Sequence, residues 1–374
     1  MVLVATCLFG LESYLGKEID NLGLKRINTI DGRVFFEGDE RELISANIYL
    51  RCAERVLILA GEFDAFSFEE LFENTKAIDF GKYIGIKDAF PVKGHSIKSK
   101  LYSIPDCQKI IKKAMVKSLS DKYNVTWFEE TGVKFQIEFL ILKDHVYLMI
   151  DTSGEGLHKR GYRKNATEAP LKETLASALV LTSRPREDVL FWDPMCGSGT
   201  IAIEAALIMT NTPPGLYRSF AFEDFPFINK KDVDEIREKA KEGIVRNGFR
   251  VYASDIDEDS LNIARNNAKI AGVDDVIKIF NQDALTIETG GLKGTIVCNP
   301  PYGERLNSLK SVEKLYREMG KAFNKLDNWQ IYILTNNEEF EKLYGRKADK
   351  KRKLYNGMIP CTLYEYFKKR EVNK

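Results

Sequence analysis

The sequence predicts a mixed α/β protein, in which a Rossmann-like, doubly wound parallel sheet follows two smaller α+β units. From about residue 166 onward, short apolar runs alternate with helical periodicity, which is typical of parallel β-α-β folds. Residues 1–60 show instead the strand and helix order of a ferredoxin-like unit. A chain of 374 residues is also long enough for more than one domain. We therefore divide it into units at 1–60, 61–155 and 166–374, with a linker at 156–165.

The first unit alternates strand and helix signals in a βαββαβ-like order. Asp31-Gly32 marks a turn before a short strand, and Gly23 suits the end of the first helix. Strands are expected at 3–9, 34–36 and 55–60, and helices at 11–22 and 40–50.

The second unit has the composition of a smaller α+β domain. Its clearest element is a helix at 106–119, for which Asp106 is the expected N-cap and whose outer face carries lysines. A further helix is expected at 68–75, and strands at 90–93, 135–139 and 146–150.

The third unit has the regular alternation of a doubly wound sheet. Strands are expected at 189–192, 251–254, 277–281, 295–298 and 330–334. Helices are expected at 171–181, 200–209, 233–247, 259–271 and 312–326.

Composition excludes several classes of protein. No run approaches eighteen apolar residues, so we expect no membrane span. The N-terminus reads as a first strand and not as a signal peptide. Six cysteines and three histidines are scattered without ligand spacing, so we expect neither a metal site nor disulfides, and a cytoplasmic location.

The net charge of +1 hides three basic clusters. Residues 93–134 hold nine lysines against four acids, and further clusters lie at 159–164 and 346–353. Basic patches on a nearly neutral protein suit a phosphate-backbone ligand, whereas each patch alone also fits a solvated lysine-rich face.

The first motif is a glycine turn between a strand and a helix. The turn Asp193-Pro194-Met195-Cys196-Gly197-Ser198-Gly199-Thr200 follows an apolar strand and opens a helical run. Glycines suit backbone that passes against a ligand or takes a positive φ. The absence of Gly-Lys-Ser/Thr excludes a P-loop, and the leading acid suits the cationic methionine end of S-adenosylmethionine better than a pyrophosphate. We expect Asp193, Pro194, Cys196, Gly197, Ser198, Gly199 and Thr200 to border this cofactor.

The next two strands also end in acids. Asp255, followed by Ile256, stands where a ribose diol would be bound, although the helix N-cap alternative fits Asp257 or Asp259 better. Asp283, followed by Ala284, can accept a hydrogen bond from the adenine amine.

The second motif, Asn299-Pro300-Pro301-Tyr302, follows another apolar strand. An exocyclic base amine is a poor nucleophile, because its lone pair is delocalised into the ring. The Asn299 side-chain oxygen and the Pro300 carbonyl can accept its two N–H bonds, and Pro300-Pro301 stiffens the loop. Tyr302 can stack on the base. Together the two motifs predict a nucleobase amino methyltransferase in which neither Cys196 nor Cys298 is needed as a nucleophile.

Three longer strings extend these motifs: Asn299–Leu306, Ala169–Glu173 and Ser153–Arg163. With them the chain resembles, over essentially its whole length, the THUMP-domain family of RNA guanine-N2 methyltransferases. Members of this family are often labelled N6-adenine-specific DNA methylases. Within it, the chain is most similar to the N-terminal methyltransferase portion of the bacterial 23S rRNA enzyme RlmL.

The resemblance implies a role for each motif. Asp193, Gly197 and Gly199 would face the methionine end of S-adenosylmethionine, while Pro170 and Lys172 would border it from the preceding helix. The THUMP domain at 61–155 would grip RNA. The implied reaction is methylation of guanine N2, first in 23S rRNA and otherwise in tRNA. N6-adenine methylation of DNA and a non-catalytic RNA-binding assembly factor remain as alternatives.

Overall fold

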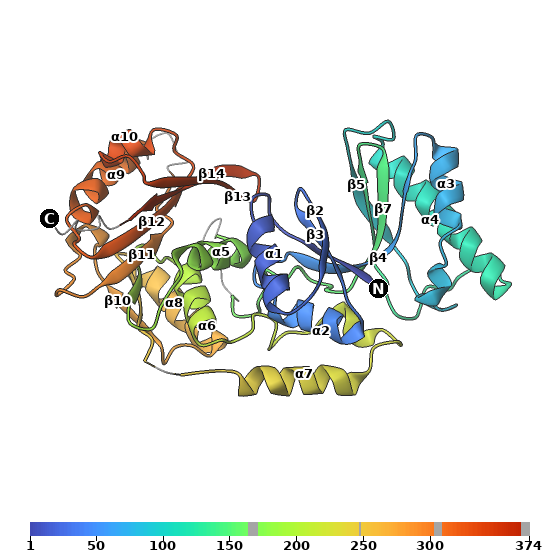
Figure 1. Cartoon of the computed structure of the whole chain (residues 1–374), viewed down its shortest axis with the longest axis horizontal. Coiled ribbons are helices and arrows are strands. Elements are labelled where there is room, and N and C mark those ends of the chain that lie inside the picture. Colours follow the sequence, from blue (N-terminus) through green and yellow to red (C-terminus); the bar gives the residue numbers. More distant parts are fainter. Residues whose placement is uncertain (164–170, 247, 303–308, 368–374) are drawn as a thin grey trace.

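The computed structural model describes residues 1–163, 171–246, 248–302 and 309–367. These parts form two seven-stranded sheets flanked by helices, and the sheets lie beside each other along the long axis of the molecule (Figure 1). The mixed α/β prediction is confirmed.

The first sheet contains the strands of both N-terminal units, in the order β2-β3-β1-β4-β7-β6-β5. The strands are β1 (Val2–Thr6), β2 (Arg26–Ile30), β3 (Arg33–Glu37), β4 (Arg55–Asp64), β5 (Val92–Ile97), β6 (Ile137–Leu142) and β7 (His145–Asp151). The helices are α1 (Glu12–Asn21), α2 (Glu40–Tyr49), α3 (Phe68–Lys76) and α4 (Ile104–Tyr123), with a 3-10 turn η1 (Phe80–Lys82). Strand β4 crosses residue 60, so one continuous sheet joins the two units whose boundary we predict there.

The second sheet has the order β10-β9-β8-β11-β12-β14-β13, in which the first five are parallel and β14 runs antiparallel to both of its neighbours. Its strands are β8 (Leu190–Asp193), β9 (Val251–Asp255), β10 (Ile277–Asn281), β11 (Gly294–Cys298), β12 (Trp329–Thr335), β13 (Lys350–Asn356) and β14 (Ile359–Tyr366). The helices are α5 (Glu173–Ser183), α6 (Thr200–Met209), α7 (Lys230–Glu242), α8 (Glu258–Ala271), α9 (Leu309–Phe323) and α10 (Phe340–Tyr344), with 3-10 turns η2 (Ala221–Asp224) and η3 (Ala284–Thr286).

The start of α4 differs from the prediction. The helix begins at Ile104, and its N-cap is Ser103 instead of Asp106. Pro105 explains the earlier start, because its fixed φ and missing N–H suit a first helical turn. Asp106 lies inside that turn and accepts the Ser103 hydroxyl at 2.5 Å.

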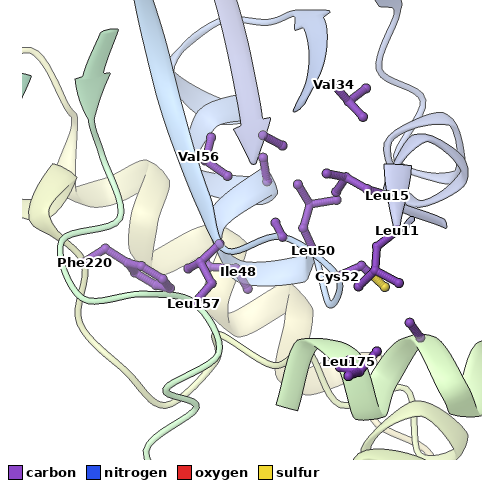
Figure 2. Packing of buried hydrophobic residues seen from close by; sticks show 14 of the residues in the cluster. Leu11, Leu15, Val34, Ile48, Leu50, Cys52, Val56, Leu157, Leu175 and Phe220 are labelled. Atoms are coloured by element: carbon purple, nitrogen blue, oxygen red, sulfur yellow. The ribbon is translucent and has the colours of Figure 1, made fainter. Parts of the chain in front are cut away.

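A shared apolar core joins the N-terminal unit to the third unit. Leu175 on α5 lies below Leu11 and Cys52 of the N-terminal unit, and Phe220 and Leu157 lie next to Ile48 (Figure 2). All of these side chains are buried. The large apolar area removed from water holds α5, and with it the approach to the glycine turn, against the N-terminal unit.

None of the helices in the described ranges is long and apolar enough to cross a membrane. In the same ranges, no three His, Cys, Asp or Glu side chains gather as metal ligands would.

Candidate active site

The two sequence motifs lie at the carboxyl edge of the second sheet. Asp193 ends β8, and Asn299 follows β11 directly. These parallel strands are neighbours, with Trp192 paired to Ile296, although β9 and β10 separate them in the sequence. The next two strands in the sequence, β9 and β10, lie on one side of β8, and β11 lies on its other side. The strand order therefore reverses between β8 and β11, and open α/β sheets bind their ligands at such a switch point.

The glycine turn is fastened to β9 and α8. The amide of Gly197 (φ 49°) donates to Oδ2 of Asp255 at 2.9 Å, and the amide of Cys196 donates to the Ser254 carbonyl at 3.0 Å. Gly199 (φ 84°) is the N-cap of α6, and a Cβ there would lie 3.1 Å from that of Ala264. Positive φ and the close helix therefore both require glycine at 199.

The residues around this turn fit S-adenosylmethionine. Asp193 is buried and has no ion-pair partner in the described chain. Burial raises the pKa of Asp193 well above its ordinary value, and the nearby Asp255 carboxylate adds to the rise. A cationic ligand group would compensate this buried acid. A Cβ on Gly197 would meet no atom within 4 Å, so there is open space beside the turn. The side chain of Ile256, after β9, is 72% exposed and offers an apolar surface to a ligand.

Asp255 and Asp283, which we predict to bind the ribose and the adenine, also accept hydrogen bonds from backbone amides of the protein. Oδ1 of Asp255 accepts the Asp257 amide at 3.1 Å, and Asp257 is the N-cap of α8, as the alternative interpretation expects. Asp283 caps η3 by accepting the Leu285 amide at 2.9 Å. Each carboxylate keeps acceptor capacity, because its two oxygens offer about four lone-pair sites.

The loop after β11 is held by tyrosine hydroxyls. The Tyr302 hydroxyl donates to Oδ1 of Asn299 at 2.5 Å and lies 3.6 Å from Sγ of Cys361 on β14. The hydroxyl of the buried Tyr316 donates to the Pro301 carbonyl at 2.9 Å. The Pro300 carbonyl accepts no hydrogen bond from the described part of the chain. Burial raises the pKa of Tyr302 and raises that of Tyr316 to about 12, so both hydroxyls stay protonated donors at neutral pH.

The two motif cysteines are unsuited to act as nucleophiles. Burial raises the pKa of both the Cys196 and the Cys298 thiol well above the ordinary value. A protonated thiol is a weak nucleophile, which agrees with chemistry that uses neither of them.

The segment before α5 contacts the N-terminal unit. Lys172 places its Nζ 2.9 Å from Glu54, which also accepts the Thr174 hydroxyl at 2.5 Å. Pro170 lies outside the described residues.

Two arginines of the second basic cluster, the buried Arg160 and the partly buried Arg163, have partners within the protein. Arg163 donates to the Leu171 carbonyl at 3.1 Å and to the Thr200 hydroxyl at 2.6 Å, next to the glycine turn. Arg160 is 6% exposed and donates to the carbonyls of Leu157 and Arg51. These two arginines therefore stabilise the junction of the units, and their guanidinium groups are bonded within the protein instead of forming part of an exposed basic patch.

The predicted lysine face is partly neutralised by ion pairs. On α4, Lys112 pairs with Glu130, and Lys117 lies 2.6 Å from Asp121. Lys109 and Lys113 are exposed and have no ion pair among the described residues. They are the α4 lysines best placed to meet a polyanion.

Three descriptions of known domains match the chain: an RlmL ferredoxin-like domain at 2–57, a THUMP domain at 65–151 and an RMKL-like methyltransferase domain at 160–365. The chain belongs to the RMKL-like methyltransferase family. A Bacillus subtilis (strain 168) protein of this kind, named "Putative RNA methyltransferase YpsC", is 47% identical, over 98% of this chain and 96% of its own.

Solved structures agree with this assignment. A "possible methylase" from Clostridium difficile 630 has a TM-score of 0.96 and 46% identity, covering 100% of this chain and 99% of its own. SMU.472, described as a methyltransferase complexed with SAH, has a TM-score of 0.92 and 44% identity, covering 99% and 98%. The methyltransferase domain and the SAH-bound relative indicate S-adenosylmethionine as the cofactor of this family member. The THUMP domain and the named relative support an RNA methyltransferase.

Proposed function

We propose that this protein transfers a methyl group from S-adenosylmethionine to the exocyclic N2 amine of a guanine in 23S rRNA. The observation that carries the proposal is the Asn299–Tyr302 loop beside the glycine turn at the switch point of the sheet. A bound cofactor supplies an activated methyl group on its sulfonium. The chain supplies acceptors that aim an amine at that methyl group.

Asn299 and Pro300 are the proposed acceptors for the amine. The Pro300 carbonyl has no internal donor in the described chain, and Oδ1 of Asn299 has a second lone pair besides the one that Tyr302 uses. Hydrogen bonds from both N–H groups would turn the nitrogen lone pair out of the ring plane, toward the methyl carbon. The nitrogen–carbon bond then forms as the carbon–sulfur bond breaks, and the amine loses one proton to solvent.

Tyr302 has two proposed roles in this site. Its hydroxyl, fixed on Asn299, orients the carboxamide so that the oxygen and not the nitrogen faces the amine. Its ring is half-buried, and we assign its accessible part to stacking on the base.

RNA is the substrate that the remaining features favour. A THUMP domain precedes the methyltransferase domain in the chain, and the B. subtilis relative carries the name of an RNA methyltransferase. The likeness of residues 2–57 to the RlmL ferredoxin-like domain favours 23S rRNA over tRNA.

The test is nucleoside mass spectrometry of 23S rRNA, 16S rRNA, tRNA and DNA from cells without this gene and from their parent. We expect one N2-methylguanosine of 23S rRNA to disappear and to return on treatment of that RNA with purified protein and labelled cofactor. Loss from tRNA alone would reassign the RNA. Loss of N6-methyladenine from DNA, with every RNA unchanged, would contradict the proposal.

A further inference from the structure

We infer that Met358, at the tip of the β13–β14 hairpin, is an apolar wedge that enters the base stack when the target guanine leaves it. This inference rests on the proposed function, because it concerns how a paired base reaches the Asn299 loop. It adds a substrate-positioning residue outside both cofactor and amine motifs.

The hairpin tip lies at the same sheet edge as the proposed chemistry. Strand β14 runs antiparallel to β12, with Thr362 paired to Thr335 at the carboxyl end of β12. The residues just before Thr362 therefore lie beyond the edge at which β11 ends in the Asn299 loop. Cys361, paired with Leu354 close to the turn, contacts the Tyr302 hydroxyl at 3.6 Å, so the part of the hairpin next to its tip touches that loop directly.

The tip exposes an apolar side chain where turns usually carry polar ones. Asn356 pairs with Ile359, which leaves Gly357 and Met358 as a two-residue turn, and Gly357 takes the required positive φ of 64°. Met358 is 95% exposed, the highest value among the large hydrophobic side chains of the described residues. A single exposed apolar side chain is not unusual by itself, so the inference depends on the position of Met358, three residues from Cys361, which contacts the Asn299 loop.

The hairpin is braced from the N-terminal unit. The rings of Phe9 and Tyr355 meet edge to face at 6.1 Å, and a Cβ on Gly10 would lie 2.9 Å from the Lys353 carbonyl. In Figure 1 the hairpin reaches from the second sheet toward α1. A wedge must resist displacement by the stacked bases, and this contact between units gives the tip that support.

The chemistry of the tip fits a base stack flanked by phosphates. Lys353 is exposed and has no ion pair in the described chain, so it can meet the backbone next to the tip. A guanine in a duplex uses N2 for pairing and must be extruded before its amine can reach Asn299. Methionine is among the side chains that proteins insert between base steps, and its flexible thioether suits an irregular gap.

The test uses two versions of one RNA hairpin. Both contain the guanosine whose N2-methylation disappears in cells without this gene. In the first version the guanosine is paired with cytosine, and in the second it faces an abasic linker. For Met358→Ala we expect kcat/KM to fall at least about tenfold (~1.4 kcal/mol) on the paired RNA and less than about twofold on the unpaired one. Met358→Leu should stay close to wild type. Ile270→Ala removes an exposed apolar side chain from α8 and should change neither rate.

A second readout follows the base stack without the chemistry. With 2-aminopurine beside the paired guanosine, wild-type protein should raise the fluorescence on binding, and Met358→Ala should not. If Met358→Ala lowers kcat/KM equally on both RNAs, or on neither of them, the wedge is overturned while the proposed function stays intact. Transfer by wild type to neither RNA would overturn the proposed function itself, and the wedge with it.

Discussion

The hydroxyl of Tyr302 donates a hydrogen bond to the side-chain oxygen of Asn299 across 2.5 Å. The two residues come from the same loop, and the contact fixes the orientation of a carboxamide whose two ends otherwise differ little in shape. In the proposed function this orientation decides whether the loop accepts or repels an N–H group.

Replacing Asn299 by alanine should abolish methyl transfer and leave cofactor binding nearly unchanged. The side chain is proposed to contact the amine, whereas the glycine turn that fits the cofactor is fastened separately, to Asp255 and Ser254. Transfer is measured with labelled cofactor on RNA from the deletion cells, and cofactor binding by calorimetry. Substantial remaining transfer would refute the role of Asn299, and loss of cofactor binding would point to a distorted loop.

Tyr302→Phe should keep the ring and lose the orienting hydroxyl. One hydrogen bond of this kind is worth about 1 kcal/mol, so we expect single-turnover transfer to slow about five- to tenfold with an unchanged cofactor Kd. Cys361→Ala is the matched control, because it removes the weaker neighbour of the same hydroxyl, 3.6 Å away. A larger effect at Cys361 than at Tyr302 would mean that packing against β14 matters more than the bond to Asn299.

The sequence was most informative where the pattern is local and least informative where side chains find distant partners. The strand before the glycine turn and the helix at 200–209 follow from buried apolar runs. Strand β2 was missed because four of its five side chains are exposed and give no alternation, and β13 because a lysine-rich edge strand resembles a solvated face.

In the candidate site too, the residues marked by a local sequence pattern could be predicted, and those that act through distant contacts could not. Asp193 and Asn299 stand out because each comes directly after a run of apolar residues, Asp193 as the last residue of β8 and Asn299 just after β11. Tyr316 and Cys361 also brace the Asn299 loop, yet they lie on α9 and β14, and nothing local marks them. The partners of Arg160 and Arg163 could not be predicted for a related reason, since a charged side chain in a basic run gives no sign of which groups it bonds inside the protein.

Lysines on α4 provide a test of RNA binding by the THUMP domain. Removing Lys109 and Lys113 together should weaken binding to the deletion-cell RNA and reduce the slope of log K against log salt by about two, roughly one per phosphate contact. The control is the double replacement of Lys117 and Lys122, which are ion-paired with Asp121 and Asp79. Equal slopes for the wild type and the first variant would show that this face is merely solvated.

Glu54 should make the junction of the units sensitive to acid. Burial alone would raise the pKa of Glu54, but the His158 ring, with its Nδ1 3.2 Å away, and hydrogen bonds from Thr174 and Lys172 outweigh it and lower the pKa to about 2. A carboxylate with a lowered folded-state pKa stabilises the fold above its unfolded pKa, and this stabilisation is lost as pH falls through the folded value. The stabilisation, on the order of 3 kcal/mol at neutral pH, should therefore fade between about pH 4.5 and 2.

Glu54→Gln tests this directly. Denaturant unfolding at pH 7, 5, 4 and 3 should show the largest deficit of the variant at pH 7 and a shrinking one below about pH 4.5. Glu62→Gln, in which a half-exposed carboxylate on β4 is replaced, should show little deficit at any pH. A deficit for Glu54→Gln that is the same at pH 3 and pH 7 would mean that the side chain stabilises the junction by packing and not by its charge. The prediction matters for the site because Glu54 binds Lys172 and Thr174, at the start of the helix that leads into β8 and the glycine turn.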